Sequence, residues 1–342
     1  MAGKHRTGLR KTSTKAPLVA RVFARLADGQ FHSGEALARS LGVSRSAVWK
    51  AARTLALLGT PLHAVRNRGY SRAHASQPLD ALKVREALAR EVRERVGDVE
   101  AVWSISSTNS ALLERPNPPP GTTEVLLAEY QTAGRGRRGR SWLAPPGGAI
   151  CLSLSWTFRD IPEDLGALSL VIGVCAVRAL KKLGVEGARL KWPNDLLVGD
   201  RKLAGILIEL RAESTGPACV VIGIGLNVAL GAALLKKIGD TDVAATDLAS
   251  TNLPLPSRNE LAAALVGASV RGLLTFEREG LKPFLSEWHD ADALRGRAIN
   301  VSGAEGNARG LARGIDVHGA LLVETAQGVR RFISGDVTVR AH

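Results

Sequence analysis

The positive charge of this chain is concentrated at its amino-terminal end. The first 75 residues hold 14 lysines and arginines against two acidic residues, so they carry +12 of the formal net charge of +14. The remaining 267 residues hold 32 basic and 30 acidic side chains and are almost neutral. Clustered basic side chains attract polyanions. The chain is therefore expected to fold into a basic module that faces a polyanion and a larger remainder that need not.

The basic module has the pattern of a helix-turn-helix followed by a hairpin. Apolar residues at helical spacing, with capping residues before them and glycines after them, predict helices over residues 18–26, 33–41 and 44–58. The alternating segment 62–70 is expected to form a hairpin wing. Together these elements predict a winged helix-turn-helix. The alternative, a three-helix packing or dimerisation domain, would leave the net charge of +12 unexplained.

The third helix and the wing would present polar and basic side chains to DNA. The residues expected to contact DNA are Ser44, Arg45, Ser46, Trp49, Lys50, Arg53, Arg66 and Arg68. Residues 1–17 are expected to form a disordered basic arm that adds sequence-independent affinity. Residues 73–79 have the composition of a linker.

Composition narrows the class of protein further. A length of 342 residues suffices for two or three domains. The sequence has neither an apolar run long enough for a membrane span nor a secretory signal, so we expect a cytoplasmic protein without a membrane partner. Cys151, Cys175 and Cys219 lack the spacing of a disulfide framework or a zinc site and are expected to be small buried side chains.

Four arginines and three glycines alternate in the segment 134–140, between two apolar runs and directly before Ser141 and Trp142. Neighbouring guanidiniums repel one another by about 1 kcal/mol per pair in water, so the segment should become ordered mainly when an anion neutralises it. Its glycines allow the backbone to approach a ligand closely. The segment could be a solvated basic loop or a localisation tract. Its position inside the chain favours a polyphosphate clamp.

Two further segments carry candidate binding residues. Hydroxyl and amide side chains gather in 106–110, where a strand meets a helix; one of them would suffice for a cap, so the cluster suits a ligand carbonyl or ureido group. Lys191 ends another strand before Trp192 and Pro193, where it can offer a fixed positive charge to a carboxylate or phosphate, although taken alone it would be a surface lysine. Neither a dinucleotide fingerprint nor a P-loop is present.

The remaining segments predict an α/β domain with a mixed sheet over 80–290 and a small β-barrel over 295–342. The predicted helices cover 80–96, 165–183, 258–276 and 281–288. The predicted strands of the larger domain cover 102–105, 124–130, 149–157, 189–191, 204–210 and 220–228, with a tight turn over 200–203.

These motifs together resemble the bifunctional biotin protein ligase and biotin operon repressor family. The match covers about residues 18–340 and consists of Gly-Gln-Phe-His-Ser-Gly-Glu (29–35), Ser-Thr-Asn (107–109), Glu-Tyr-Gln-x-Ala-Gly-Arg-Gly-Arg-Arg-Gly-Arg-x-Trp (129–142), Lys-Trp-Pro-Asn-Asp (191–195), Lys-Leu-Ala-Gly-Ile-Leu (202–207), Gly-x-Gly-x-Asn-Val (223–228) and Arg-Gly-Ile-Asp-x-x-Gly-Ala-Leu (313–321). The resemblance implies a class II synthetase-like central domain and an SH3-like carboxy-terminal barrel.

The resemblance also implies a two-step reaction. Biotin and MgATP would form biotinyl-5′-AMP and pyrophosphate, and biotin would then pass to a lysine of the biotin carboxyl carrier protein of acetyl-CoA carboxylase. The adenylate would act as corepressor by favouring a homodimer on operator DNA. The alternatives are a biotin-sensing DNA-binding regulator that has lost ligase activity and a lipoate ligase, which would need a different loop at 134–140.

The resemblance assigns roles to residues of this sequence. Biotin would be bound by Ser107, Thr108, Asn109, Gln131, Arg135, Gly136, Arg137, Lys191, Gly223 and Gly225. ATP would be bound by Arg137, Arg138, Arg140, Trp142, Lys191 and Asn227. Lys191, Arg137 and Arg140 would be catalytic. Asp195 would orient Lys191, approach Mg²⁺ or simply form a structural turn.

Overall fold

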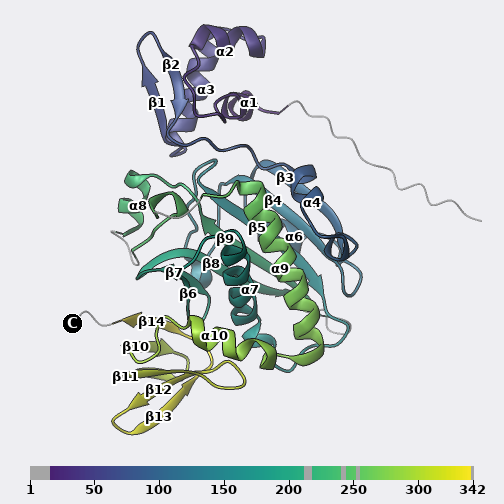
Figure 1. Ribbon diagram of the computed structural model, residues 1–342, viewed down its shortest axis with the longest axis vertical. Helices are drawn as coiled ribbons and strands as arrows, with labels where there is room; N and C mark the ends of the chain where they lie inside the picture. Colours follow the sequence, from purple (N-terminus) through teal and green to yellow (C-terminus); the bar gives the residue numbers. More distant parts are fainter. Residues whose placement is uncertain (1–15, 212–217, 240–243, 252–254, 340–342) are drawn as a thin grey trace, which may run out of the picture.

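The computed structural model describes residues 16–211, 218–239, 244–251 and 255–339. Its strands form a two-stranded hairpin, a seven-stranded mixed sheet and a five-stranded antiparallel sheet, which follow one another along the molecule (Figure 1). We refer to the corresponding parts as the amino-terminal, central and carboxy-terminal domains. Of the arm expected over residues 1–17, residues 1–15 lie outside the described residues.

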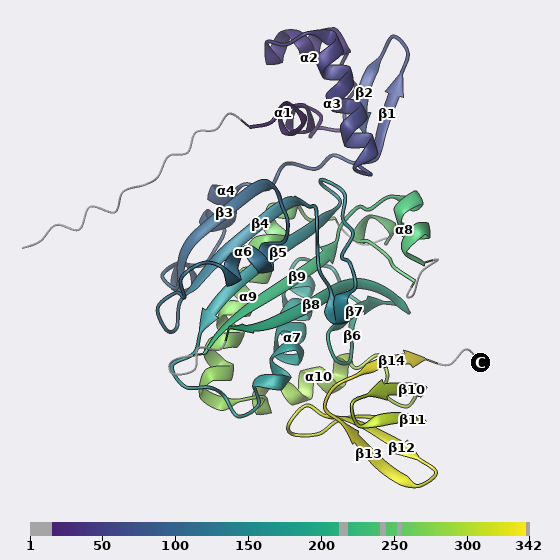
Figure 2. The same ribbon diagram turned by 180° about the vertical axis from the view of Figure 1, so that it is seen from behind.

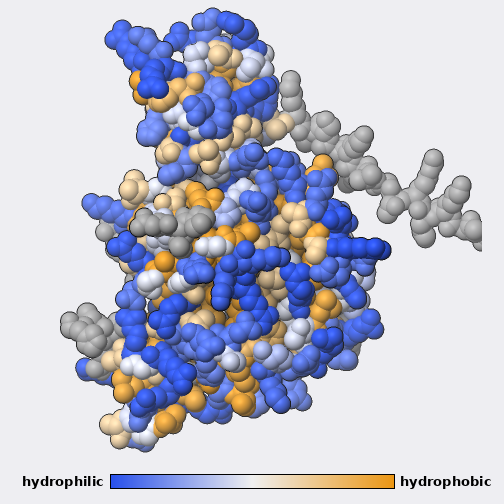
Figure 3. Space-filling view, viewed as in Figure 1, coloured by the Kyte–Doolittle hydropathy of each residue, from blue (hydrophilic) through white to orange (hydrophobic). Residues whose placement is uncertain are grey.

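The amino-terminal domain has the expected helix-turn-helix and hairpin. Its elements are α1 (Leu18–Arg25), α2 (Gly34–Leu41), α3 (Arg45–Leu57), β1 (Leu62–Val65) and β2 (Gly69–Arg72). The hydroxyls of Ser33 and Ser44 cap α2 and α3 by accepting hydrogen bonds from the amides of Ala36 and Ala47. The three helices enclose a core of their own around Phe23. The face of this domain that Figure 3 shows is mostly hydrophilic.

The central sheet has the strand order β3-β4-β5-β9-β8-β7-β6, in which β3 and β4 are parallel and the other neighbours antiparallel. The strands are β3 (Val96–Ile105), β4 (Thr123–Gln131), β5 (Ala149–Thr157), β6 (Ala188–Lys191), β7 (Asp195–Val198), β8 (Arg201–Arg211) and β9 (Cys219–Asn227). The expected mixed sheet is confirmed. The tight turn expected over 200–203 is shorter, because β8 begins at Arg201.

Helices cover both faces of this sheet. They are α4 (Ala81–Glu86), α5 (Arg90–Arg93), α6 (Thr108–Leu113), α7 (Leu168–Lys182), α8 (Ala232–Gly239), α9 (Arg258–Glu279) and α10 (Leu285–Ala291). The long helices α7 and α9 pack on one face (Figure 1), and α6 lies on the other (Figure 2). At the crossing of α7 and α9, a Cβ atom on Gly272 would lie 2.2 Å from the sulfur of Cys175, so only glycine permits this contact. Each of the three cysteines is buried and free.

Two expected helices are wrong in their extent. The helix expected over 281–288 is a 3-10 turn over Lys282–Phe284 followed by α10. The segment 80–96 forms the two short helices α4 and α5 instead of a single one, and strand β3 already begins at Val96. The side chain of Arg93 donates hydrogen bonds of 3.0 and 2.9 Å to the carbonyls of Glu86 and Leu88, so carbonyls at the break have a partner outside the helix. This contact between residues several positions apart is invisible in the hydrophobic periodicity.

The carboxy-terminal domain is an antiparallel sheet of order β13-β12-β11-β10-β14. Its strands are β10 (Ala298–Gly303), β11 (Gly306–Ile315), β12 (Leu321–Thr325), β13 (Gly328–Phe332) and β14 (Asp336–Val339). The indole of Trp192 donates a 3.1 Å hydrogen bond to the carbonyl of Gly319 and so ties this sheet to the central domain. Over the described part of the chain, no helix combines the length and the apolar character needed to cross a membrane.

Candidate ligand site

One cavity of the central domain gathers most of the candidate residues. It is lined by the start of α6, the ends of β4 and β6, the middle of β5, β8 and β9, the arginine loop (residues 134–140) and β14 of the carboxy-terminal domain. The predicted residues that line it are Ser107, Thr108, Asn109, Gln131, Arg135, Gly136, Arg137, Arg140, Trp142, Lys191, Asp195, Gly223 and Gly225. Segments more than 200 residues apart in the sequence therefore meet around one space.

The polar end of the cavity is built from hydroxyl and amide groups. Ser107 caps α6, and its neighbours Thr108 and Asn109 are nearly buried. The hydroxyl of Ser153 on β5 lies 2.6 Å from the hydroxyl of Thr108 and 2.6 Å from the amide oxygen of Asn109. The amide oxygen of Gln131 accepts a 2.7 Å hydrogen bond from the backbone N–H of Thr108. This network fixes the orientation of several donors and acceptors at once, as a small polar ligand requires.

Glu209 on β8 connects this polar end to the arginine loop. One of its carboxylate oxygens accepts a 2.8 Å hydrogen bond from the amide nitrogen of Asn109. The same oxygen accepts a second hydrogen bond of 2.8 Å from the guanidinium of Arg135, with which it forms an ion pair. Because the nitrogen of Asn109 faces Glu209, its oxygen must face Ser153. Sequence reasoning missed Glu209, which lies beside the Lys-Leu-Ala-Gly-Ile-Leu motif but outside it.

The two glycines of β9 make room for side chains of the site. A Cβ atom on Gly223 would lie 2.4 Å from the amide oxygen of Asn109, and one on Gly225 would lie 2.4 Å from the Trp142 ring. Both distances are far below a normal contact, so these positions require glycine. The close approach predicted for β9 is thus present, but Asn109 and Trp142 occupy it.

Three arginines of the arginine loop contact polar groups of the protein itself. Arg137 donates a 3.0 Å hydrogen bond to the amide oxygen of Asn194, while Arg138 and Arg140 both pair at 3.0 Å with the carboxylate of Asp336 on β14. The backbone of Arg138 has a φ of 54°, which turns the chain between its neighbours. Asp336 therefore neutralises part of the charge of the loop from within the protein, and ordering of the loop by a bound anion stays a prediction.

Three charged side chains lie where β6 ends and β7 and β8 begin. Asp195 pairs with Lys202 at 2.7 Å, and both line the cavity together with Lys191. Burial lowers the pKa of Lys191, the nearby Asp195 raises it, and the positive charge of Lys202 lowers it further. Asp195 thus has a direct partner in Lys202, a residue whose role sequence reasoning missed although it lies in a quoted motif.

The cavity as a whole is electropositive. Its lining contains five basic side chains and two acidic ones, which gives a formal excess of +3. The basic residues are Arg135, Arg137, Arg140, Lys191 and Lys202, and the acidic ones are Asp195 and Asp336. Burial also lowers the pKa of Arg137, while Asp336 opposes that shift. A half-buried site with excess positive charge favours a polyanion.

Two predicted residues lie outside this lining. Arg138 points to Asp336, and Asn227 is buried with its amide donating 2.9 Å to the carbonyl of Thr246. Among the described residues, no group of three or more histidine, cysteine or acidic side chains is arranged to hold a metal ion.

The predicted DNA-contacting residues form an exposed surface on α3 and the hairpin. All eight of these side chains belong to solvent-exposed residues. Trp49 is 50% exposed, with the guanidinium of Arg53 at 5.4 Å from its ring. At the other end of this surface, the guanidinium of Arg68 stacks 4.1 Å from the ring of Phe31. The surface therefore combines exposed cations with an exposed aromatic ring, which suits a nucleic-acid interface.

Comparison with known proteins matches three segments of the chain to described families. Residues 102–227 match the Biotin/lipoate A/B protein ligase family, residues 21–71 match the HTH domain, and residues 295–340 match the Biotin protein ligase C terminal domain. The first of these matches contains the arginine loop and the residues of the cavity from α6 to β9.

Relatives of known identity match nearly the whole chain. The bifunctional ligase/repressor BirA of Salmonella typhimurium is 38% identical over 96% of this chain and 98% of its own, and that of Escherichia coli is 38% identical over 94% and 97%. The structure of the biotin protein ligase from Aquifex aeolicus in complex with biotin and ATP is 28% identical, covers 71% of this chain and 99% of its own, and superposes with a TM-score of 0.60. The chain therefore belongs to the biotin protein ligase family and has the domains of its bifunctional ligase/repressor members.

Proposed function

We propose that this protein activates biotin with ATP, transfers it to a lysine of the biotin carboxyl carrier protein of acetyl-CoA carboxylase, and represses transcription of biotin synthesis genes. The observation that carries the ligase assignment is the meeting of two chemically different ends in one cavity. One end holds neutral donors and acceptors around Asn109, and the other holds Lys191 and the arginine loop. Biotin has a neutral ureido ring and an anionic carboxylate, and ATP adds the polyphosphate.

The two ends divide the ligands between them. The ureido group of biotin would lie against Ser107, Thr108, Asn109 and Gln131. Its valerate would run toward Lys191 past Asn109 and Trp142, the side chains that pack on Gly223 and Gly225. Arg137 and Arg140 would bind the phosphates of ATP, and Trp142 would stack on adenine. Arg138 would join them once the triphosphate competes with Asp336. Asn227 would act indirectly, because its amide holds the backbone beside the site.

The first step is a displacement at phosphorus. A carboxylate oxygen of biotin attacks the α-phosphorus of ATP, the bond to the bridging oxygen breaks, and pyrophosphate leaves with that electron pair. Lys191, Arg137 and Arg140 stabilise the negative charge shared by the carboxylate and the α-phosphate. The side chains position the reactants and supply charge, and no protein nucleophile is needed.

Mg²⁺ would accompany ATP. Such an ion keeps several water ligands and is held by phosphates with one or two carboxylates, so the two acidic residues of the lining fit it without a complete protein cage. Bound there, it would neutralise phosphate charge. Asp195 is the carboxylate that we propose for it, once its present partner Lys202 turns to the phosphates.

The second step is acyl transfer. The ε-amine of a carrier-protein lysine attacks the carbonyl carbon of biotinyl-5′-AMP, an amide bond forms, and AMP leaves with its phosphate charge held by the same arginines. The mixed anhydride reacts with water, so a loop closed over it preserves the intermediate. β14 borders this opening, and we propose that the carboxy-terminal domain contributes to carrier-protein and ATP engagement.

The same adenylate would act as corepressor. We propose that it favours a homodimer whose two helix-turn-helix domains bind a palindromic operator through α3 and the wing. We further propose domain limits of 18–73, 80–290 and 295–342 behind a basic arm over 1–17, a class II synthetase-like central fold and an SH3-like carboxy-terminal barrel.

Biotin-dependent exchange of radiolabelled pyrophosphate into ATP tests the first step, and transfer of labelled biotin to an isolated acceptor domain tests the second. Exchange followed by transfer is the expected result. A protein that binds biotin and DNA but catalyses no exchange would instead be a sensor without ligase activity.

Arg137→Ala should weaken retention of biotin and of biotinyl-5′-AMP together. A charge-assisted hydrogen bond contributes about 1.5–3 kcal/mol, so dissociation of both ligands should accelerate by roughly tenfold or more. Stopped-flow measurement of their release checks this. Arg138→Ala is the matched comparison within the loop, and we expect a smaller effect because Arg138 does not line the cavity. Unchanged release from the Arg137 variant would contradict the assignment.

Glu209→Gln should raise the KM for biotin by about tenfold while changing kcat much less. The substitution keeps the shape of the side chain but removes the charge that holds Arg135 and presents a second amide to Asn109. Steady-state kinetics of pyrophosphate release give both parameters. Glu287→Gln, which removes an arginine-bound carboxylate that does not line the cavity, is the control. Equal KM values in the two variants would remove Glu209 from the site.

A further inference from the structure

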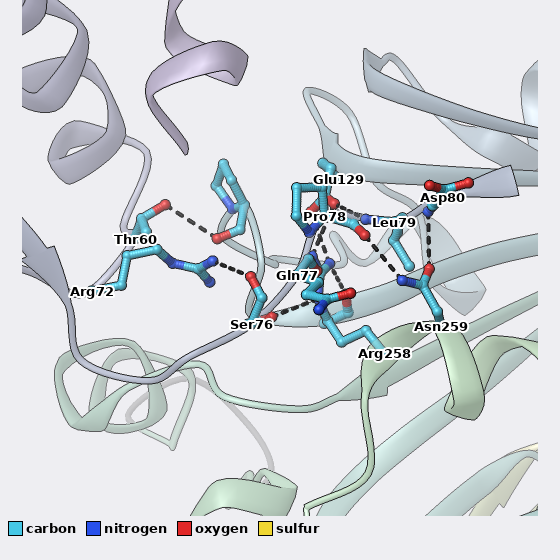
Figure 4. A network of polar contacts seen from close by, with 12 residues as sticks. Thr60, Arg72, Ser76, Gln77, Pro78, Leu79, Asp80, Glu129, Arg258 and Asn259 are labelled. Atoms are coloured by element: carbon cyan, nitrogen blue, oxygen red, sulfur yellow. Dashed lines mark hydrogen bonds and ion pairs between the residues drawn. The ribbon is translucent and has the colours of Figure 1, made fainter. Parts of the chain in front are cut away.

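The linker (residues 73–80) between the amino-terminal and central domains is fastened to the central domain by polar contacts, which Figure 4 shows. It leaves β2, crosses to the central domain and ends at the cap of α4. Its first residues are exposed, but the side chain of Leu79 is buried. The segment therefore connects the two domains as expected, but its second half packs against the central domain.

The centre of these contacts is a buried ion pair. The guanidinium of Arg258, at the start of α9, contacts the carboxylate of Glu129, near the end of β4, through two parallel hydrogen bonds of 2.8 and 2.9 Å. The two side chains are only 1% and 6% exposed. Burying two charges is costly unless every donor and acceptor finds a partner. The other hydrogen-bond partners of Arg258 and Glu129 therefore indicate which segment of the chain this ion pair holds.

All five N–H groups of Arg258 have acceptors. Besides the two bonds to Glu129, Nε donates to the hydroxyl of Ser76 at 3.0 Å, Nη2 to the carbonyl of Gln77 at 2.8 Å and Nη1 to the carbonyl of Ala149 at 3.4 Å. Glu129 in turn accepts a hydrogen bond from the backbone N–H of Leu79. Both members of the ion pair thus hold the linker.

The next residue of α9 holds the linker as well. The amide of Asn259 donates 3.1 Å to the carbonyl of Pro78 and accepts 2.9 Å from the backbone N–H of Asp80. A capping box between Ser257 and Glu260 fixes this first turn of α9. We call Glu129, Arg258 and Asn259 the linker clamp.

Ser76 joins the linker clamp to the amino-terminal domain. Its backbone N–H donates 2.9 Å to the carbonyl of Ala27, its own carbonyl accepts 2.6 Å from Arg72, and its hydroxyl accepts the bond from Arg258. The backbone N–H and carbonyl of Ser76 thus bind the amino-terminal domain, and its hydroxyl binds α9. Direct contacts accompany this junction, among them the rings of Phe23 and Trp103 at 5.3 Å and the hydroxyl of Thr60 with the carbonyl of Pro146 at 3.2 Å.

We propose that the linker clamp fixes the amino-terminal domain in one orientation on the central domain, so that the two move as one body. The clamp is also placed beside the ligand site, since Glu129 lies two residues before Gln131 on β4, about 7 Å along the strand. Only the description of the amino-terminal domain as DNA-binding rests on the function proposed above. Orienting that domain would set the separation of two recognition helices in a dimer.

The test uses the full-length Glu129→Gln protein. Glutamine has the shape of glutamate, but its NH₂ group would face the donors of Arg258, and the buried cation would lose its counter-charge. We expect the hydrogen-bonded linker amides of Ser76, Leu79 and Asp80 to exchange with deuterium at least tenfold faster than in the wild type. In ¹⁵N relaxation, the amides of α1–α3 should acquire a shorter rotational correlation time than those of the central sheet. Glu91→Gln is the control, because it removes an exposed ion pair with Arg271, which lies on α9 as Arg258 does.

Protection of the amides of α7 and α9 reports whether the Glu129 variant is folded. If it is folded, and the linker exchanges as in the wild type with one correlation time for the whole chain, the proposal is overturned. If it does not fold, Asn259→Ala decides, because it removes two linker contacts and leaves the ion pair. Several-fold faster linker exchange in that variant supports the clamp, and unchanged exchange refutes it. Neither measurement uses biotin, ATP or DNA, so failure of the proposed function would be seen separately.

Discussion

Replacing Lys191 by alanine is expected to slow formation of biotinyl-5′-AMP by roughly a hundred- to a thousandfold. Removing one preorganised charge or donor from a site that stabilises developing charge has an effect of that size. Lys191 is half-buried, and burial lowers the pKa of its ammonium group, so the protein maintains this charge at a cost. A half-buried ammonium group is favourable when an anionic ligand binds beside it and neutralises its charge. Single-turnover measurement of adenylate formation, with biotin and MgATP saturating, isolates this step.

Lys182→Ala is the matched control, because Lys182 is an exposed lysine at the end of α7. It should form the adenylate at the wild-type rate. The affinity of the Lys191 variant for biotin alone should fall much less than its rate, because the ureido end of the pocket is intact. A Lys191 variant that forms adenylate normally would show that the arginine loop alone stabilises the reacting phosphate.

The sequence was sufficient to predict those parts of the site that are encoded by short motifs. Ser107 to Asn109, the arginine loop and Lys191 each have an unusual local composition, and the structure brings them to one cavity. Glycines at 223 and 225 were recognised as places of close approach, for the sound reason that a strand rarely tolerates two. The sequence did not show that the groups lying close to these glycines are side chains of the protein, Asn109 and Trp142.

The part of the site that the sequence did not predict includes the pairing of Lys202 with Asp195 and two single acidic residues with ordinary neighbours in the sequence. Asp336 neutralises Arg138 and Arg140 from a distance of almost 200 residues, and Glu209 fixes Asn109 from 100 residues away. A lone acidic residue in a strand gives no periodic signal. The same limitation hid the linker clamp, since Glu129 and Arg258 are meaningful only as a pair. The break between α4 and α5 likewise coincides with hydrogen bonds of the Arg93 side chain, which hydrophobic periodicity does not show.

Removal of residues 1–75 is expected to abolish DNA binding while leaving some ligation. These residues contain the exposed surface of α3 and the hairpin and nearly all of the net positive charge. Loss of several phosphate contacts reduces DNA affinity by roughly a thousandfold or more at moderate salt. The cavity draws none of its lining from them. Binding to duplexes selected by the wild-type protein from a random pool, with biotin and MgATP present, measures the first effect, and biotin transfer measures the second.

The deletion also removes contacts at the domain junction, such as that of Phe23 with Trp103, so reduced ligation alone would not separate charge from packing. The full-length double variant Lys50→Glu and Arg53→Glu makes this separation, because both side chains are exposed and the core around Phe23 is retained. It should lose DNA binding and keep full ligase activity. Lys181→Glu with Lys182→Glu makes the same change in net charge at the end of α7 and should retain both activities. If the α3 variant bound DNA as tightly as this control, the recognition surface would have to lie elsewhere, and the deletion would have acted through the junction.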